Sequence, residues 1–141
     1  MTSPATQGLS LYEAARVAGV TFSTEAVPED RFVEANDMRF HYLDWGNPDK
    51  PDMLLLHGFA QQCHSWDFVA LAFTDKFHVR ALDLRGHGDS DWAPDGDYSP
   101  EAQQNDIKGV VQEIGLKDFV LMGLSMGGRN SFTYASTPPD E

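Results

Sequence analysis

Short apolar runs alternate with segments of helical periodicity along most of this chain. Residues 53–56 are a continuous apolar run, which is typical of a strand buried on both faces. Residues 77–82 and 119–122 predict two further strands. Apolar positions at helical spacing predict helices over residues 65–73, 100–114 and 126–137. This strand–helix alternation predicts an α/β fold with a mostly parallel sheet and helices on both faces.

The region before residue 53 has a different pattern. Residues 32–35 and 38–43 flank Asn36-Asp37, which predicts a tight turn between two antiparallel strands leading into the sheet. Residues 1–30 are polar at both ends, and residues 9–17 could form one short helix. We therefore divide the chain into a loosely attached leader, residues 1–30, and one α/β domain, residues 31–141.

The most informative motif is Gly123-Leu124-Ser125-Met126-Gly127, which follows the last predicted strand. A serine between two glycines at a strand-to-helix turn is typical of a nucleophile elbow. The turn is so tight that Gly123 and Gly127, two residues before and two residues after the serine, come into contact. Both positions therefore require glycine, because a Cβ would clash there. Met126 begins the next helix, and its N–H group has no partner within that helix.

A second interpretation of the same segment is a phosphate-binding P-loop, because residues 123–130 have similar glycine spacing. The P-loop lysine and hydroxyl are replaced here by Arg129 and Asn130. Asn130 lacks the hydroxyl that would bind magnesium, which makes this interpretation the weaker one.

Composition and charge disfavour several classes of binding partner and cofactor. The 141 residues carry a formal net charge of −12, which disfavours nucleic acid and anionic membrane surfaces as partners. Cys63 is the single cysteine, and no apolar stretch has the length of a membrane span. No His-x-x-x-His pair or Cys/His cluster suggests a metal site. We expect a cytoplasmic protein without a metal or other cofactor.

Three strand-end motifs together resemble the α/β-hydrolase superfamily, in particular its esterase-like serine members. They are His57-Gly58-Phe59, the loop of residues 83–90, and the elbow at Ser125, and the resemblance extends over residues 31–141. It implies a small acyl substrate, Ser125 as the nucleophile, and the backbone N–H groups of Phe59 and Met126 as the oxyanion hole. It implies structural roles for His57, Gly58, Asp83, Arg85, Gly86, His87, Gly88, Gly123 and Gly127.

Two details refine this resemblance. Asp83 and Arg85 are expected to form an ion pair that fixes their loop. Epoxide opening and dehalogenation on this fold use an aspartate as the nucleophile, so a serine at position 125 favours ester or related acyl chemistry.

The catalytic base and its acidic partner, which follow the serine in this superfamily, are not evident. No histidine follows Ser125, and Asp140 and Glu141 are the only later acids. We therefore expect a chain truncated before the sixth strand and inactive by itself. Residues 119–122 would then form an open sheet edge and promote self-association. The alternative is a non-catalytic ligand-binding protein, or a fragment protein, of the same fold.

Overall fold

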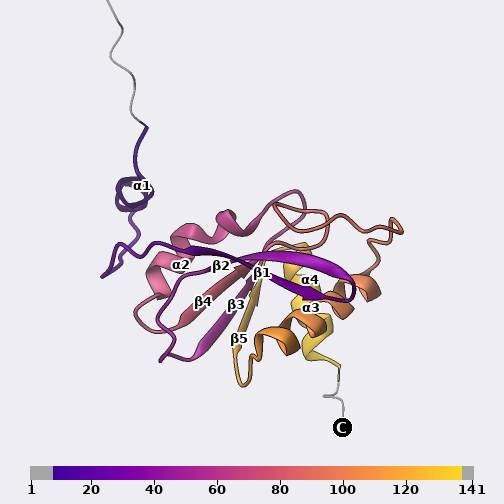
Figure 1. The fold of residues 1–141 in the computed structure, drawn as a ribbon. Helices are drawn as coiled ribbons and strands as arrows, with labels where there is room; N and C mark the ends of the chain where they lie inside the picture. Colours follow the sequence, from indigo (N-terminus) through magenta and orange to yellow (C-terminus); the bar gives the residue numbers. More distant parts are fainter. Residues whose placement is uncertain (1–7, 138–141) are drawn as a thin grey trace, which may run out of the picture.

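The structure is a computed structural model that describes residues 8–137, and its centre is a five-stranded mixed sheet (Figure 1). The strand order is β1-β2-β4-β3-β5, in which β3 runs parallel to β4 and β5. Strands β1 and β2 form an antiparallel hairpin, and β2 also pairs antiparallel with β4. This arrangement confirms the predicted fold class. The strands are β1 (Glu29–Ala35), β2 (Met38–Asp44), β3 (Asp52–Leu56), β4 (His78–Leu82) and β5 (Val120–Gly123).

The hairpin turn forms where the sequence predicts it. Asn36 and Asp37 have φ angles of 52° and 60°, which short polar residues adopt more readily than others. Their conformation pairs Ala35 directly with Met38.

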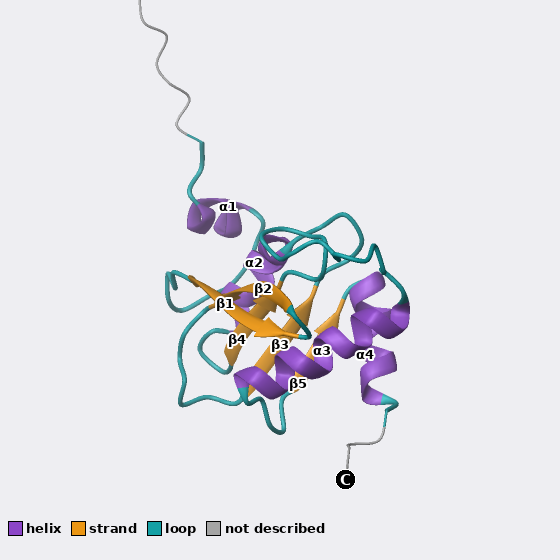
Figure 2. Cartoon of the chain, turned by 45° about the vertical axis from the view of Figure 1, so that its right-hand side comes forward, coloured by secondary structure: helices purple, strands orange, loops and turns teal. Residues whose placement is uncertain are grey.

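Helices cover both faces of the sheet (Figure 2). On β3, Leu54 and Leu56 face one core, which includes residues of α3 (Pro100–Ile114) and is contacted by α4 (Met126–Ala135). Met53 and Leu55 face the other core, with α2 (Asp67–Phe73). Because successive side chains of a strand point to opposite faces, one apolar run of β3 supplies both cores.

The ends of α3 follow the capping rules. The Ser99 hydroxyl accepts a hydrogen bond from the Ala102 N–H, Pro100 occupies the first turn, and Gly115 ends the helix at φ 80°. Elsewhere the bounds shift by one to three residues, and the largest shift is the start of β1 at Glu29 instead of residue 32. The Phe77 N–H bonds the Phe73 carbonyl at the end of α2, so β4 begins one residue later than predicted. Residues Cys63–Trp66 form a 3-10 turn before α2.

The N-terminal segment contains the expected short helix, α1 (Leu11–Val17). Ala15 is fully buried, and the Tyr12 hydroxyl donates a hydrogen bond to the Ala26 carbonyl at 2.8 Å. Residues 1–7 of the predicted leader lie outside the described residues, and its boundary at residue 30 stays a prediction.

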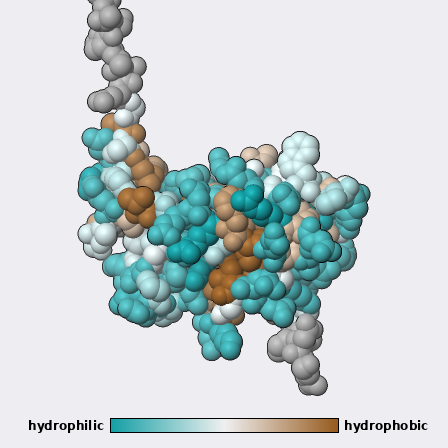
Figure 3. Space-filling model, in the orientation of Figure 1, coloured by the Kyte–Doolittle hydropathy of each residue, from teal (hydrophilic) through white to brown (hydrophobic). Residues whose placement is uncertain are grey.

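Strand β5 stands at one end of the sheet. Within residues 8–137 it pairs with β3 alone, and Val120 is 40% exposed. Figure 3 shows apolar surface, in brown, on the face on which β5 lies in Figure 1. No helix in the described part of the chain combines the length and apolar character that a membrane span needs.

Candidate active site

Ser125 lies in a strained two-residue turn, Leu124-Ser125, between β5 and α4. Its φ and ψ are 54° and −112°, and its side chain is exposed. A Cβ at Gly123 would overlap the backbone of Gly127, and a Cβ at Gly127 would overlap the carbonyl of Leu56 in β3. Close packing of backbone on both sides therefore holds the serine in a conformation that costs about 1–3 kcal/mol.

The loop after β3 packs against this turn. A Cβ at Gly58 would lie 3.4 Å from the Ser125 Cβ and 3.3 Å from the Leu124 carbonyl oxygen. Within residues 8–137, the N–H groups of Phe59 and Met126 donate no hydrogen bond. One unpaired donor thus lies in the loop that packs against the elbow and the other at the residue after Ser125, and backbone N–H groups are the donors that a developing oxyanion requires.

Two histidines join the strand-end loops. The buried His57 accepts a hydrogen bond at Nε2 from the Leu84 N–H, so its Nδ1–H donates to the Gly58 carbonyl at 2.8 Å. Burial lowers the pKa of His57 and keeps the ring neutral. His87 bridges the Ala60 N–H and the Arg85 carbonyl, with its ring centre 4.9 Å from that of His57.

The predicted ion pair between Asp83 and Arg85 is wrong. Arg85 donates from Nε and Nη2 to both carboxylate oxygens of Asp106 in α3, at 2.5 and 2.7 Å. Asp83 instead accepts from the N–H groups of Cys63 and Asp89, at 2.7 and 3.0 Å. The two side chains point to opposite faces of the sheet, because the chain turns immediately after β4.

The glycines of this loop leave room for its neighbours. Gly86 and Gly88 both have positive φ. A Cβ at Gly88 would overlap the Asp83 carboxylate, and one at Gly86 would meet the ring of Tyr98. Both positions therefore accept only glycine without rearrangement.

A buried cluster of His41, Cys63 and Asp83 was not expected from the sequence. The three possible ligand atoms lie within 4.8 Å of one another. His41 Nδ1 is 2.7 Å from Asp83, and its Nε2 is 2.7 Å from Asp30. Burial lowers the pKa of His41, but the hydrogen bonds to these two aspartates outweigh it and leave that pKa raised. These hydrogen bonds already use the ligand atoms of His41 and Asp83, so the cluster is better explained as support for the loop.

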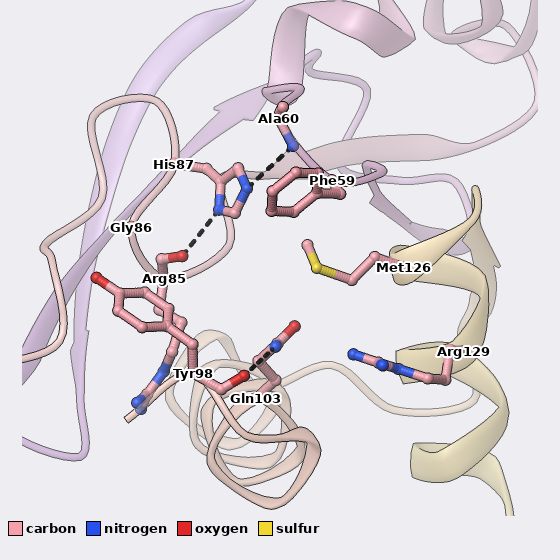
Figure 4. Close-up of a pocket in the computed structure, with 9 residues that line it drawn as sticks. All are labelled: Phe59, Ala60, Arg85, Gly86, His87, Tyr98, Gln103, Met126 and Arg129. Carbon is pink, nitrogen blue, oxygen red and sulfur yellow. Dashed lines mark hydrogen bonds between the residues drawn. The ribbon is translucent and has the colours of Figure 1, made fainter. Parts of the chain in front are cut away.

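An open cavity of about 720 Å³ lies beside the elbow (Figure 4). Phe59 and Met126 line it, and Phe59 is 76% exposed. The loop after β4 contributes His87, and the other wall comes from Tyr98, Gln103 and Arg129. No motif marks Tyr98 or Gln103. The sequence marked Arg129 only as part of the P-loop interpretation. Its spacing of four residues from Ser125, about one helical turn, is the signal that could have placed it beside the elbow.

Comparisons with known proteins agree with this arrangement. The model of a family described as the alpha/beta hydrolase fold matches residues 51–141. Epoxide hydrolase 4 of Homo sapiens is 36% identical over 110 residues, which are 77% of this chain and 30% of that protein. An esterase of Mycobacterium tuberculosis is 34% identical over 130 residues, which are 92% of this chain and 41% of the esterase.

A solved structure also matches this chain. The crystal structure of a membrane phospholipase A matches with a TM-score of 0.74 at 31% identity, over 89% of this chain and 39% of that one. The chain thus spans less than half the length of each of these three relatives.

Proposed function

Because the chain belongs to the alpha/beta-hydrolase family, we propose that it acts as a serine hydrolase on a carboxylic ester or a related acyl compound. Ser125 is the nucleophile in this proposal. The observation that carries it is the exposed serine at φ 54°, held by backbone contacts and flanked by two unpaired N–H groups.

The reaction follows from this geometry. The Ser125 oxygen attacks the acyl carbon, and the carbonyl oxygen takes up negative charge. The N–H groups of Phe59 and Met126 donate to that oxygen, and each such donor typically contributes about 10²–10³ in rate. The proton of the Ser125 hydroxyl passes through solvent to the oxygen of the leaving alcohol as the bond between that oxygen and the acyl carbon breaks. Water then adds to the acyl-serine, which releases the acid and restores the Ser125 hydroxyl.

Other chemistries of the family fit the residues of this chain less well. Some relatives are epoxide hydrolases or a dehalogenase, but those reactions use an aspartate where this chain has Ser125. The P-loop interpretation is disfavoured because α4 begins directly after Ser125 and leaves no loop to surround a phosphate. The Asn130 side chain is also buried and donates to Gln103 at 2.7 Å.

None of the five histidines of this sequence is an evident base for Ser125. All five histidines precede Ser125 in the sequence, and the ring nitrogens of His57 and His87 are already hydrogen-bonded. We therefore expect little turnover from the 141-residue chain itself. The oxyanion donors should remain effective, since about 10³–10⁴-fold catalysis survives loss of triad members in serine proteases.

The test is covalent labelling of the 141-residue chain by a fluorophosphonate, mapped by mass spectrometry. We expect slow labelling at Ser125 that is faster than at exposed serines such as Ser136. Hydrolysis of p-nitrophenyl acetate should fall in Ser125→Ala to the rate of an unrelated acidic protein. Labelling without preference for Ser125, or hydrolysis unchanged in Ser125→Ala, would refute the proposal.

A non-catalytic ligand-binding role is the second candidate, favoured by the open cavity of about 720 Å³ beside the elbow. Saturable binding of a small ligand in the cavity, without labelling of Ser125, would support that role instead.

A further inference from the structure

Arg129 differs from every other arginine in the part of the chain that the structure describes. Arg16, Arg31, Arg80 and Arg85 each contact a carboxylate at 2.7 Å or less. Arg39 lies over the Phe32 ring at 3.7 Å. Within residues 8–137, Arg129 has neither kind of partner, although acidic residues outnumber basic ones by 22 to 10.

The Arg129 side chain extends toward the cavity rather than along the surface of α4 (Figure 4). The other arginine there, Arg85, is bound to Asp106 and to the Asp97 carbonyl. Among the described residues that line the cavity, none is an aspartate or a glutamate. An anion entering this space would therefore meet one uncommitted guanidinium and no adjoining carboxylate in the wall.

The position of Arg129 relates this charge to the reacting carbon. Its backbone N–H donates to the Ser125 carbonyl at 2.9 Å, so it stands one turn beyond the serine on α4. The guanidinium can thus reach a group that lies several bonds from an acyl carbon placed at Ser125. Phe59 and Met126, the residue after Ser125, supply apolar wall of the same cavity.

We propose that Arg129 binds a carboxylate of the substrate, so that the preferred substrates are esters or amides with a free carboxylate several bonds from the scissile carbonyl. A planar carboxylate matches the paired N–H donors of a guanidinium. The inference rests on the proposed function in taking Ser125 as the position of the acyl carbon.

Binding tests this inference without requiring turnover. Monomethyl glutarate, an anionic ester, and dimethyl glutarate, its neutral counterpart, are titrated into the Ser125→Ala chain and followed by calorimetry. We expect the anionic ester to bind at least about tenfold more tightly, and rising salt to reduce the difference. Adding Arg129→Gln should abolish the preference, and Arg129→Lys should keep part of it.

Arg16→Gln is the matched control, because Arg16 is exposed on α1 and pairs with Glu25. It should leave the preference intact, and thermal melts should show that every variant is folded. Equal binding of the two esters to Ser125→Ala, or a preference that survives Arg129→Gln, would overturn the inference.

Fluorophosphonate labelling of the parent chain separates the two proposals. Labelling at Ser125 without an anion preference would remove the role of Arg129 alone. An Arg129-dependent preference without labelling would remove the hydrolase proposal and leave an anion-binding cavity.

Discussion

Replacing Ser125 with glycine should stabilise the fold while it removes the proposed nucleophile. Relief of the strain at φ 54° and ψ −112° is worth about 1–3 kcal/mol. The greater freedom of glycine in the unfolded chain opposes this by about 0.5–1 kcal/mol. The Ser125 side chain makes no capping hydrogen bond to α4, so little else is lost. We therefore expect Ser125→Gly to raise the free energy of unfolding by about 0–2 kcal/mol.

The assay is urea denaturation and thermal melting followed by circular dichroism, with Ser125→Ala measured in parallel. A gain of 1 kcal/mol should raise the melting temperature by about 2–4 °C in a chain of this size. Ser125→Ala keeps the backbone strain and loses only the hydroxyl, so its stability should stay within about 0.5 kcal/mol of the parent. If Ser125→Gly were clearly less stable than Ser125→Ala, the turn would not be strained and the argument would fail.

Three further predictions concern the supports of the site and the sheet edge. Gly127→Ala should destabilise the chain by at least about 2 kcal/mol in urea titration, because its Cβ would overlap the Leu56 carbonyl, whereas Gly8→Ala, with open space around it, should not. The pKa of His41 is raised in the folded chain above its ordinary value of 6.5, so protonated His41 stabilises the fold fully below pH 6.5 and this stabilisation is lost as pH rises through the folded pKa. The free energy of unfolding, measured by urea titration, should therefore fall as pH rises from 6.5 through the folded pKa in the parent, and this fall should be absent in His41→Gln. We expect self-association through the edge of β5, visible by analytical ultracentrifugation and reduced in Val120→Lys; a monomeric parent would contradict it.

The sequence was sufficient where structure depends on neighbours along the chain. The turn at Asn36-Asp37, the caps of α3 and the position of the elbow all follow from local spacing. Near Trp66 the sequence could not distinguish a 3-10 turn from the start of an α-helix, because both give similar apolar spacing there.

Contacts between distant segments could not be predicted in the same way. Arg85 pairs with Asp106, which lies 21 residues away, and no sequence spacing distinguishes that carboxylate from Asp83. His41, Cys63 and Asp83 come from three separate elements and meet only because β2 lies beside β4 in the sheet. Likewise, the cavity needs the loops after β3 and β4 to face both α3 and α4.

The close approach of Gly127 to the Leu56 carbonyl positions the backbone of Ser125, the proposed nucleophile, by main-chain atoms. Side chains around the cavity, Phe59 and Arg129 among them, can therefore be exchanged without displacing it. An engineer seeking a new specificity could randomise Phe59 and Arg129, whereas the two elbow glycines should tolerate no variation.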